Sequence, residues 1–393
     1  MGDLFTFEKP LGLRDTVPHI YEMKAHIESC IVEEMKRWGY RLIETPTIEY
    51  YDTIGAASAL PDEKLLKLLD YEGRSLVLRP EMTAPIARMA ATRLLKENQP
   101  LRLAYSSYVY RAQHKSEGTP AEFKQIGVEC IADNTVSADG EMIALLIATL
   151  EKTALNTFQI SIGNIQFVRV LFLQILEDEE QTQTLTTFLY TKNDVGYREY
   201  IKTLSLSSKN EQRLLDFLKL RGHEEVLEKA SALLEEGEGK EVVRQMKKLW
   251  QVMMDYGVEK RIKLDFTLVS QMNYYSGILF EVYSDQVGFP IGNGGRYDYL
   301  FNQFGKNTGA TGFALRLDLL VEAIGYLNSN KPRLCILFSE DRRKEAYHMS
   351  KEKRAQGLHV VLQDIKGVTH LDTYKDQYEE TILLIGDAER TNT

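Results

Sequence analysis

Apolar residues recur at intervals of three and four over residues 20–38, which is the spacing of one face of an amphipathic helix. The stripe ends at Gly39, a residue type that commonly terminates helices. The next segment, 41–51, is rich in β-branched and aromatic residues and contains Pro46. This composition favours an edge strand or an element that enters a subunit interface.

A short strand, a polar turn and a helix are predicted next. Residues 75–78 have a strand pattern, residues 79–83 (RPEMT) form a polar turn, and Pro85 suits the first turn of a helix. Polar side chains at the end of a strand make this turn a candidate ligand position.

A hairpin with a long loop is predicted over residues 101–131. Strand patterns at 101–111 and 123–131 are separated by a polar segment with Gly and Pro. Gln125 and Glu129 are four residues apart and therefore share one face of the second strand. A helix over 139–155 should follow.

The composition becomes helical and charged from about residue 168 to 256. Strand patterns return at 262–269 and 277–284, after which the sequence predicts a Gly-rich turn at 292–298 (GNGGRYD) and a helix over 312–326. Strands on both sides of the helical stretch indicate one domain that is interrupted by an insertion.

The last part of the chain has the pattern of a small α/β unit with parallel strands. Strands are predicted at 334–338, 360–363 and 381–385, with a helix over 340–356. The predicted fold class is therefore α+β. The predicted domains are a core of residues 1–167 plus 257–328, a helical insertion domain of residues 168–256 and a short α/β unit of residues 329–393.

Composition narrows the functional classes. The 393 residues are 44% hydrophobic and 27% charged, a globular profile that excludes disorder and low complexity. Lys and Arg number 48 against 57 Asp and Glu, a net charge of −9, so no overall positive field attracts a polyanion. The segment 331–393 has equal numbers of acidic and basic residues, so it has no excess of basic residues for binding nucleic acid either.

Cysteine usage and the apolar runs favour a cytoplasmic protein. Cys30, Cys130 and Cys335 are far apart, without the spacing of a zinc site or a disulfide framework. The first residues do not have the pattern of a secretory signal, and no stretch approaches the ~18 apolar residues of a membrane span. No metal, cofactor or membrane partner is expected.

Generic catalytic motifs such as the phosphate-binding P-loop and the GxSxG nucleophile turn do not occur. Five other segments instead match motifs of one known protein family, in the same order and at the same spacing. They are 79–83 (RPEMT), 110–129 (YRAQHKSEGTPAEFKQIGVE), 268–281 (LVSQMNYYSGILFE), 294–298 (GGRYD) and 311–320 (TGFALRLDLL). Together with PLGLRDTVP at 10–18 and GYRLIETPTIE in the first strand region, they resemble the catalytic domain of histidyl-tRNA synthetases.

The resemblance implies a class II synthetase fold, an antiparallel sheet flanked by helices that dimerises through the first motif. It also implies a histidine pocket. By the family's motifs the amino end of histidine would be held by Glu81, Thr83 and Gln125, and the imidazole by Glu129, Tyr275 and Tyr297. Tyr274 and Arg111 complete the candidate binding set, and carboxylates with an amide are suited to an ammonium and an imidazolium.

The same resemblance indicates that the part of the site that binds ATP in the synthetases is lost. ATP chemistry needs fixed arginines at the phosphates, and the family pattern supplies three. One is kept as Arg111, whereas the other two positions hold Ser270 and Leu319, with Arg316 one helical turn from the latter. Further motif-two positions that are charged or basic in the family hold Gln113, His114, Thr119 and Ala121. Each lost donor of this kind removes ~3–4 kcal/mol of transition-state stabilisation, so the sequence predicts no useful synthetase activity.

A chain that keeps the histidine pocket but loses ATP chemistry resembles the regulatory subunits of ATP phosphoribosyltransferase, which are paralogues of the synthetase. This resemblance implies a non-catalytic subunit that supports a short-form catalytic subunit and transmits feedback inhibition by histidine in histidine biosynthesis. It also implies a homodimer within a hetero-octamer, and no tRNA partner is expected.

Alternatives remain at the level of sequence. The chain could be a divergent histidyl-tRNA synthetase in which Arg316 replaces a lost arginine, or a synthetase-like regulator of another partner. The polar pocket residues could form a self-satisfied buried network, and Arg111 could bind an anion, pair with a carboxylate or be vestigial. Alternation along a strand would turn only one of Tyr274 and Tyr275 toward a ligand, and Tyr275 is favoured. The charged run 224–248 is interpreted as a solvated helix face, and His114 as a loop residue.

Overall fold

The computed structural model describes residues 9–55, 57–58, 60–95, 99–113, 120–270, 274–325 and 334–386. The chain forms two compact units, residues 1–325 and 326–393. None of the helices in the described ranges is long and apolar enough to cross a membrane.

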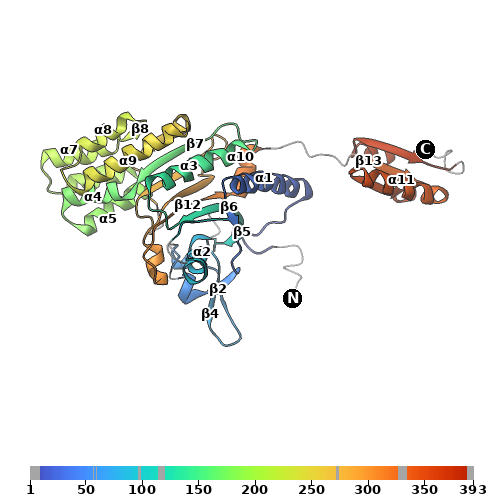
Figure 1. Cartoon of the computed structure of the whole chain (residues 1–393), viewed down its shortest axis with the longest axis horizontal. Coiled ribbons are helices and arrows are strands. Elements are labelled where there is room, and N and C mark those ends of the chain that lie inside the picture. Colours follow the sequence, from blue (N-terminus) through green and yellow to red (C-terminus); the bar gives the residue numbers. More distant parts are fainter. Residues whose placement is uncertain are drawn as a thin grey trace. The chain divides into compact units, whose positions relative to one another are not determined.

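A nine-stranded sheet forms the centre of the first unit (Figure 1). Its order is β1-β5-β6-β12-β11-β10-β7-β9-β8. The pairs from β5 to β7 are antiparallel, as predicted, whereas β1 with β5 and β7 with β9 are parallel. The strands are β1 (Arg41–Leu42), β5 (Leu101–Tyr110), β6 (Glu122–Ile131), β7 (Gln159–Asn164), β8 (Arg221–Gly222), β9 (Ile262–Asp265), β10 (Ile278–Tyr283), β11 (Gly292–Arg296) and β12 (Ala310–Arg316).

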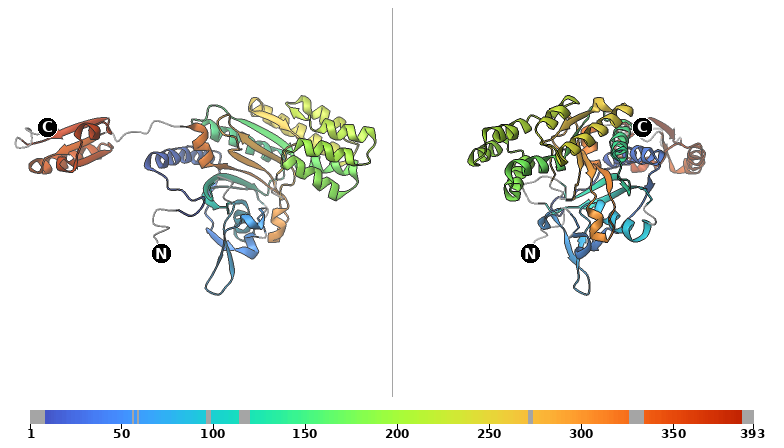
Figure 2. Two further views of the ribbon diagram at one scale, coloured as in Figure 1. Left: turned by 180° about the vertical axis from the view of Figure 1, so that it is seen from behind. Right: turned by 60° about the vertical axis from the view of Figure 1, so that its left-hand side comes forward.

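Three helices cover one face of this sheet, as Figures 1 and 2 show: α1 (Pro18–Arg37), α3 (Val136–Glu151) and α10 (Leu317–Ile324). The predicted stripe of α1 is the buried one, because Met23, Ile27, Ile31 and Met35 all lie in the core. The opposite face is left for α2 (Thr83–Met89) and for the turn that precedes it.

A small antiparallel sheet precedes α2, in the order β2-β4-β3. Its strands are β2 (Ile48–Tyr50), β3 (Lys67–Leu69) and β4 (Ser75–Leu78). The buried guanidinium of Arg79 donates to the carbonyls of Thr45 (2.6 Å) and Tyr108 (2.8 Å), so the turn after β4 is fixed against β5. The segment 41–51, predicted as an edge strand or an interface element, forms β1 and β2, and both lie at the edges of their sheets.

Helices occupy the stretch where the sequence predicted an insertion. They are α4 (Ile165–Leu176), α5 (Glu179–Tyr190), α6 (Asp194–Thr203), α7 (Ser208–Phe217), α8 (Glu225–Ala232) and α9 (Glu238–Asp255). The first four begin at polar caps, Asn164, Asp178, Asn193 and Ser207, whose side chains accept from backbone N–H groups of the first turn. Phe167, Phe172 and Phe217 pack together beneath them. The domain boundary at 168–256 stays a prediction.

The second unit is a three-stranded parallel sheet, in the order β14-β13-β15, as the sequence predicted. The strands are β13 (Leu334–Phe338), β14 (Val360–Asp364) and β15 (Glu380–Leu384), with helices α11 (Arg343–Ala355) and α12 (Leu371–Lys375). Short π-helical segments are η1 (Tyr51–Gly55) and η3 (Ala90–Leu94). Short 3₁₀ helices are η2 (Asp62–Lys64), η4 (Glu259–Arg261), η5 (Leu300–Phe304), η6 (Glu340–Arg342) and η7 (Ile365–Gly367).

Two predictions near the end of the first unit were wrong. The segment 292–298 was predicted as a turn, but residues 292–296 form the central strand β11. The helix predicted over 312–326 begins only at Leu317, because β12 occupies residues 310–316. Close backbone packing explains the first error, since a Cβ at Gly294 would meet the ring of Phe280 at 2.5 Å.

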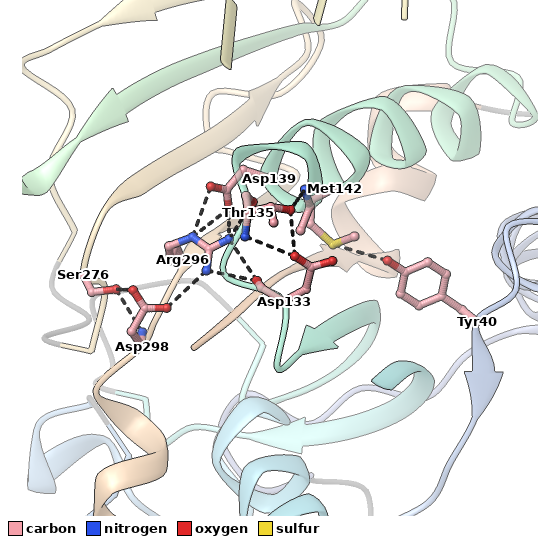
Figure 3. A network of polar contacts seen from close by, with 9 residues as sticks. Tyr40, Asp133, Thr135, Asp139, Met142, Ser276, Arg296 and Asp298 are labelled. Atoms are coloured by element: carbon pink, nitrogen blue, oxygen red, sulfur yellow. Dashed lines mark hydrogen bonds and ion pairs between the residues drawn. The ribbon is translucent and has the colours of Figure 1, made fainter. Parts of the chain in front are cut away.

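A buried ion pair joins β11 to α3 (Figure 3). The Arg296 guanidinium contacts the Asp139 carboxylate at 2.9 Å and also reaches Asp298 at 3.3 Å. It donates further to the backbone carbonyls of Asp133 and Thr135, so its donors are well used. Ser276 contacts Asp298 from the segment before β10. The network therefore fixes the end of β11 and residues 297–298 against the helix.

We predict that Arg296→Ala lowers the free energy of unfolding by about 3–5 kcal/mol, because it leaves the buried Asp139 carboxylate without its cation. Urea denaturation followed by circular dichroism measures the change. Arg244→Ala is the matched control, since it removes an exposed pair with Glu241 and should leave the midpoint nearly unchanged. Equal, small effects of both variants would contradict the structural role of the buried pair.

Candidate functional site

A cavity lies on the sheet face opposite α1 and α3. Its floor is formed by neighbouring strands in which glycines lie beside polar side chains. A Cβ at Gly312 would collide with the Glu129 carboxylate, and one at Gly295 would approach the Tyr275 ring to 2.8 Å. Gly127 is equally restricted, because a Cβ there would lie 2.5 Å from the Tyr105 hydroxyl. The glycines therefore make room for the polar groups above them.

Glu81 lies in the wall of the cavity, in the turn between β4 and α2. It is 2% exposed, and its carboxylate accepts from the backbone N–H of Thr83 (2.5 Å) and of Ala84 (2.9 Å). These bonds stabilise the ionised form, but burial dominates and raises the pKa of Glu81.

Glu129 projects into the cavity from β6, also at 2% exposure. Its carboxylate accepts from the hydroxyls of Thr83 (3.0 Å) and Tyr297. Burial raises its pKa to about 8, although both hydrogen bonds act in the opposite direction. Within the ranges that the structure describes, neither Glu129 nor Glu81 forms an ion pair with Lys or Arg.

Gln125 lies four residues before Glu129 on the same face of β6, as the sequence predicted. Its Oε1 is buried and has no hydrogen-bond partner among the described residues. An unsatisfied buried acceptor is costly, and here it lines a cavity with two carboxylates. The arrangement is therefore suited to a ligand that donates hydrogen bonds.

Tyrosines form the remaining wall. The ring of Tyr274 lies 5.1 Å from that of Tyr275 and 5.7 Å from that of Tyr297, in both cases edge to face. Both Tyr274 and Tyr275 line the cavity, so the prediction that strand alternation turns one of them away was wrong. The pair precedes β10, which begins at Ile278, and alternation does not apply outside a strand.

The structure brings seven of the eight predicted site residues to this cavity: Glu81, Thr83, Gln125, Glu129, Tyr274, Tyr275 and Tyr297. It adds Tyr105, Asn293, Gly294, Gly312, Phe313 and Ala314, which sequence reasoning missed. The row Tyr105, Gly127, Ala314 and Asn293 runs straight across four strands. Only the sheet register shows that these residues lie side by side, so no local sequence signal identifies them.

Arg111 does not line the cavity. Its Nε donates to the carbonyl of Pro80 (3.0 Å), directly before Glu81, and its guanidinium lies 5.1 Å from the Phe123 ring. Burial and the neighbouring Arg316 lower the pKa of Arg111 to about 10, whereas Glu81 acts to raise it. Arg111 thus remains a cation behind the Glu81 end of the cavity.

The positions that indicated a lost ATP-binding part are only partly described. Leu319 is 9% exposed in α10, and Ala121 is buried with its N–H bonded to the carbonyl of Gly12 (2.8 Å). Arg316 forms an ion pair with Asp318 (2.7 Å) and lies 4.2 Å from the Phe123 ring. His114 and Thr119 lie outside the described residues.

The cavity can recognise a ligand by hydrogen bonding and charge. Two carboxylates, two amides and several phenols converge on it, a set that favours a small molecule with cationic donors. No group of three metal-ligating side chains occurs in the part of the chain that the structure describes.

Comparisons with known proteins agree with these features. A family model described as "Histidyl-tRNA synthetase" matches residues 12–320, and one described as "Histidyl-tRNA synthetase HisZ, C-terminal domain" matches residues 335–386. A Geobacillus kaustophilus protein named ATP phosphoribosyltransferase regulatory subunit is 52% identical over 387 residues, 98% of each chain. A Bacillus subtilis protein of the same name is 45% identical, with 98% of each chain covered.

Solved structures give the same result. A Bacillus halodurans structure titled "ATP phosphoribosyltransferase regulatory subunit/histidyl-tRNA synthetase" matches with a TM-score of 0.91 at 48% identity, covering 97% of this chain and 99% of the other. A Nostoc histidyl-tRNA synthetase has a TM-score of 0.80 at 20% identity, covers 94% and 89% of the two chains, and shows the fold alone. The predicted family resemblance and the α+β synthetase-like fold are confirmed.

We predict that Glu129→Gln flattens the pH dependence of stability. The folded-state pKa of Glu129, about 8, lies above its ordinary value of 4.5, so the fold favours the protonated carboxyl. Its stabilising effect is therefore present at acid pH and lost as the pH rises from about 4.5 to 8. A glutamine cannot ionise, and the variant should be a few kcal/mol more stable than the unaltered protein at pH 8 but not at pH 5.

Urea denaturation at pH 5, 6, 7 and 8 measures this difference. Glu236→Gln, at an exposed position in the helical region, is the matched control and should leave the profile unchanged. Parallel profiles for the unaltered protein and Glu129→Gln would contradict a raised pKa at Glu129.

Proposed function

The chain belongs to the family of ATP phosphoribosyltransferase regulatory subunits, and on that premise we propose that it is a histidine sensor for a short-form catalytic subunit. In this role it supports the activity of the partner and transmits feedback inhibition by histidine. The observation that carries the proposal is the cavity, in which two buried carboxylates and an unsatisfied amide oxygen lie without a basic partner among the described residues.

Histidine has donors that match these acceptors. Its ammonium would lie near Glu81, Thr83 and Gln125, where the unpaired Gln125 Oε1 supplies an acceptor. Its ring would lie among Glu129, Tyr275 and Tyr297, with Tyr274 packed against both tyrosine rings. Arg111, fixed on the carbonyl of Pro80, would attract the carboxylate of the amino acid from behind the Glu81 turn. Charge-assisted hydrogen bonds of this kind are stronger than hydrogen bonds between neutral groups.

We also propose that the chain has no aminoacylation activity of its own. The two positions that carry arginine in the synthetases hold Ser270 and the buried Leu319. Arg316, the last residue of β12, is the cation nearest to position 319 in the sequence, but it is paired with Asp318 and lies over Phe123. An arginine that is already neutralised contributes less to a developing phosphate charge. A divergent synthetase is therefore not favoured.

A tRNA partner is not supported either. The second unit is a sheet of three strands, and residues 331–393 have no net charge. Nucleic-acid binding depends strongly on basic side chains that neutralise phosphates, and this segment has no excess of them.

Regulation requires that histidine bind two states of the complex with different affinity. A coupling free energy of about 1–3 kcal/mol gives roughly 5- to 150-fold inhibition, which is sufficient for feedback control. Because Glu129 connects α2 through Thr83 to the segment after β11 through Tyr297, occupancy of the cavity acts on several elements at once.

Self-association is supported by the small sheet. Ile48, Tyr50 and Leu68 are each more than 40% exposed, and their register with Leu76 and Leu78 places all five on one face. Exposed apolar faces of this kind mark protein interfaces. We propose that this face contributes to a homodimer, which would assemble with catalytic subunits into a cytoplasmic hetero-octamer.

We predict that the dimer dissociates when charge is placed on this face. The double variant Ile48→Glu, Leu68→Glu buries two carboxylates in the proposed interface, and light scattering after gel filtration should show a shift from dimer to monomer. Val195→Glu alters an even more exposed apolar residue, on α6, and is the control. An unchanged mass for the double variant would exclude this face from the dimer contact.

We predict that adding this chain to a short-form catalytic subunit of the same organism raises phosphoribosyl-ATP formation, and that histidine then inhibits the reaction. Glu129→Gln should keep the stimulation but need about 5- to 150-fold more histidine, because a charged hydrogen bond worth ~1–3 kcal/mol is lost. Calorimetry should show the same loss in histidine affinity, with Glu236→Gln as the control.

Two results would contradict the proposal. An unchanged rate and an unchanged response to histidine would exclude regulation of this partner. Histidine-dependent exchange of pyrophosphate into ATP would identify a divergent synthetase instead.

A further inference from the structure

Asn293 occupies an unusual place for its residue type. It lies in β11, the fifth of nine strands in the sheet, where asparagine is disfavoured. Its neighbours Gly292 and Gly294 have no side chains, and its cross-strand partners are Glu281 on β10 and Ala314 on β12. A residue that breaks a local rule in the centre of a sheet is a candidate for a functional role.

Its side chain contacts one of the residues assigned to the imidazole. The Nδ2 amide group donates to the Tyr275 hydroxyl oxygen at 3.2 Å, and both residues line the cavity. The ring of Tyr275 cannot move away freely, since it packs edge to face on Tyr274 and lies against the backbone of Gly295. The hydroxyl is thus held at one place in the wall.

This bond determines whether the Tyr275 hydroxyl donates or accepts a hydrogen bond toward the cavity. A phenol has one hydrogen to donate and two lone pairs to accept with. One lone pair of Tyr275 is occupied by Asn293, and its hydrogen is donated to none of the residues that the structure describes. The hydrogen is therefore left for an acceptor in the cavity.

Glu129 offers the opposite polarity. Each of its oxygens accepts one hydroxyl, from Thr83 and from Tyr297, and the group keeps further lone pairs to accept from a ligand. The cavity therefore combines a donor at Tyr275 with an acceptor at Glu129. A five-membered ring with one N–H and one unprotonated nitrogen satisfies both groups.

We propose that Asn293 is a positioning residue that selects the neutral imidazole of histidine, by holding the Tyr275 hydroxyl as a donor opposite Glu129. The inference rests on the proposed function, because it takes histidine as the ligand. It goes beyond that function in assigning a role to Asn293 and a protonation state to the bound ring.

The substitutions that test this role differ in hydrogen-bond polarity at position 293. Asn293→Ala leaves the Tyr275 hydroxyl free to rotate, whereas Asn293→Asp would accept its hydrogen and leave only lone pairs for the ligand. Tyr275→Phe removes the hydroxyl altogether. Asn293→Ser is a second small variant in case the alanine variant does not fold, and thermal melting checks each protein.

Calorimetry on the full chain at pH 8, where free imidazole is neutral, should show 3- to 10-fold weaker histidine binding for Asn293→Ala or Asn293→Ser. Asn293→Asp should bind at least 10-fold more weakly. In the Tyr275→Phe background neither change should have a further effect, because Asn293 acts through that hydroxyl. Weak binding of 3-(2-thienyl)-L-alanine, whose ring has no nitrogen, should not respond to Asn293→Ala.

The outcomes separate this inference from the proposed function. If the unaltered protein does not bind histidine, the proposed function fails. If it binds histidine while Asn293→Asp binds equally well or more tightly, Asn293 does not hold Tyr275 as a donor and the inference is overturned. An equal loss from Asn293→Ala with and without the Tyr275 hydroxyl would also overturn it, because Asn293 would then act through sheet packing.

Discussion

The burial of two carboxylates in one cavity is the constraint on which the rest of the site depends. Glu81 and Glu129 are each 2% exposed, and the described residues offer them hydroxyl and amide donors but no ion pair. Burial raises the pKa of both groups, so the protein alone favours a form that is less charged than the isolated carboxylates. A cationic ligand reverses this preference, and its binding can therefore change the free energy of the surrounding elements.

The sheet makes this burial sterically possible. Gly312 and Gly295 are opposite each other on β12 and β11, and Gly312 is opposite Glu129 on β6. Side chains in this row would displace the carboxylate or the Tyr275 ring. Next to Gly295, the Arg296 guanidinium is clamped on Asp139, so the residue that follows, Tyr297, is placed at Glu129 by a buried ion pair outside the cavity. The stability of the fold and the geometry of the cavity are thus coupled through Gly295, Arg296 and Tyr297.

Local patterns predicted what depends on local physics. The period of α1, the β5–β6 hairpin and the shared face of Gln125 and Glu129 follow from side-chain spacing alone. The turn predicted at 292–298 was wrong because glycine usually signals a turn, whereas here it permits close strand packing. The cavity residues contributed by sheet register, such as Tyr105 and Asn293, could not be found because their proximity depends on the order of four strands. Family motifs supplied the candidate site residues that spacing could not.

The proposed loss of ATP chemistry and the retention of the amino-acid cavity have one physical consequence in common. A synthetase uses ligand binding to prepare a reaction, and its ligand leaves as a product. A sensor must release its ligand unchanged, so that occupancy follows concentration. Uncharged residues at positions 270 and 319, and an Arg316 neutralised by Asp318, favour the second behaviour, since little remains to polarise a bound phosphate. The binding energy of the cavity is then available for coupling to a partner instead of for catalysis.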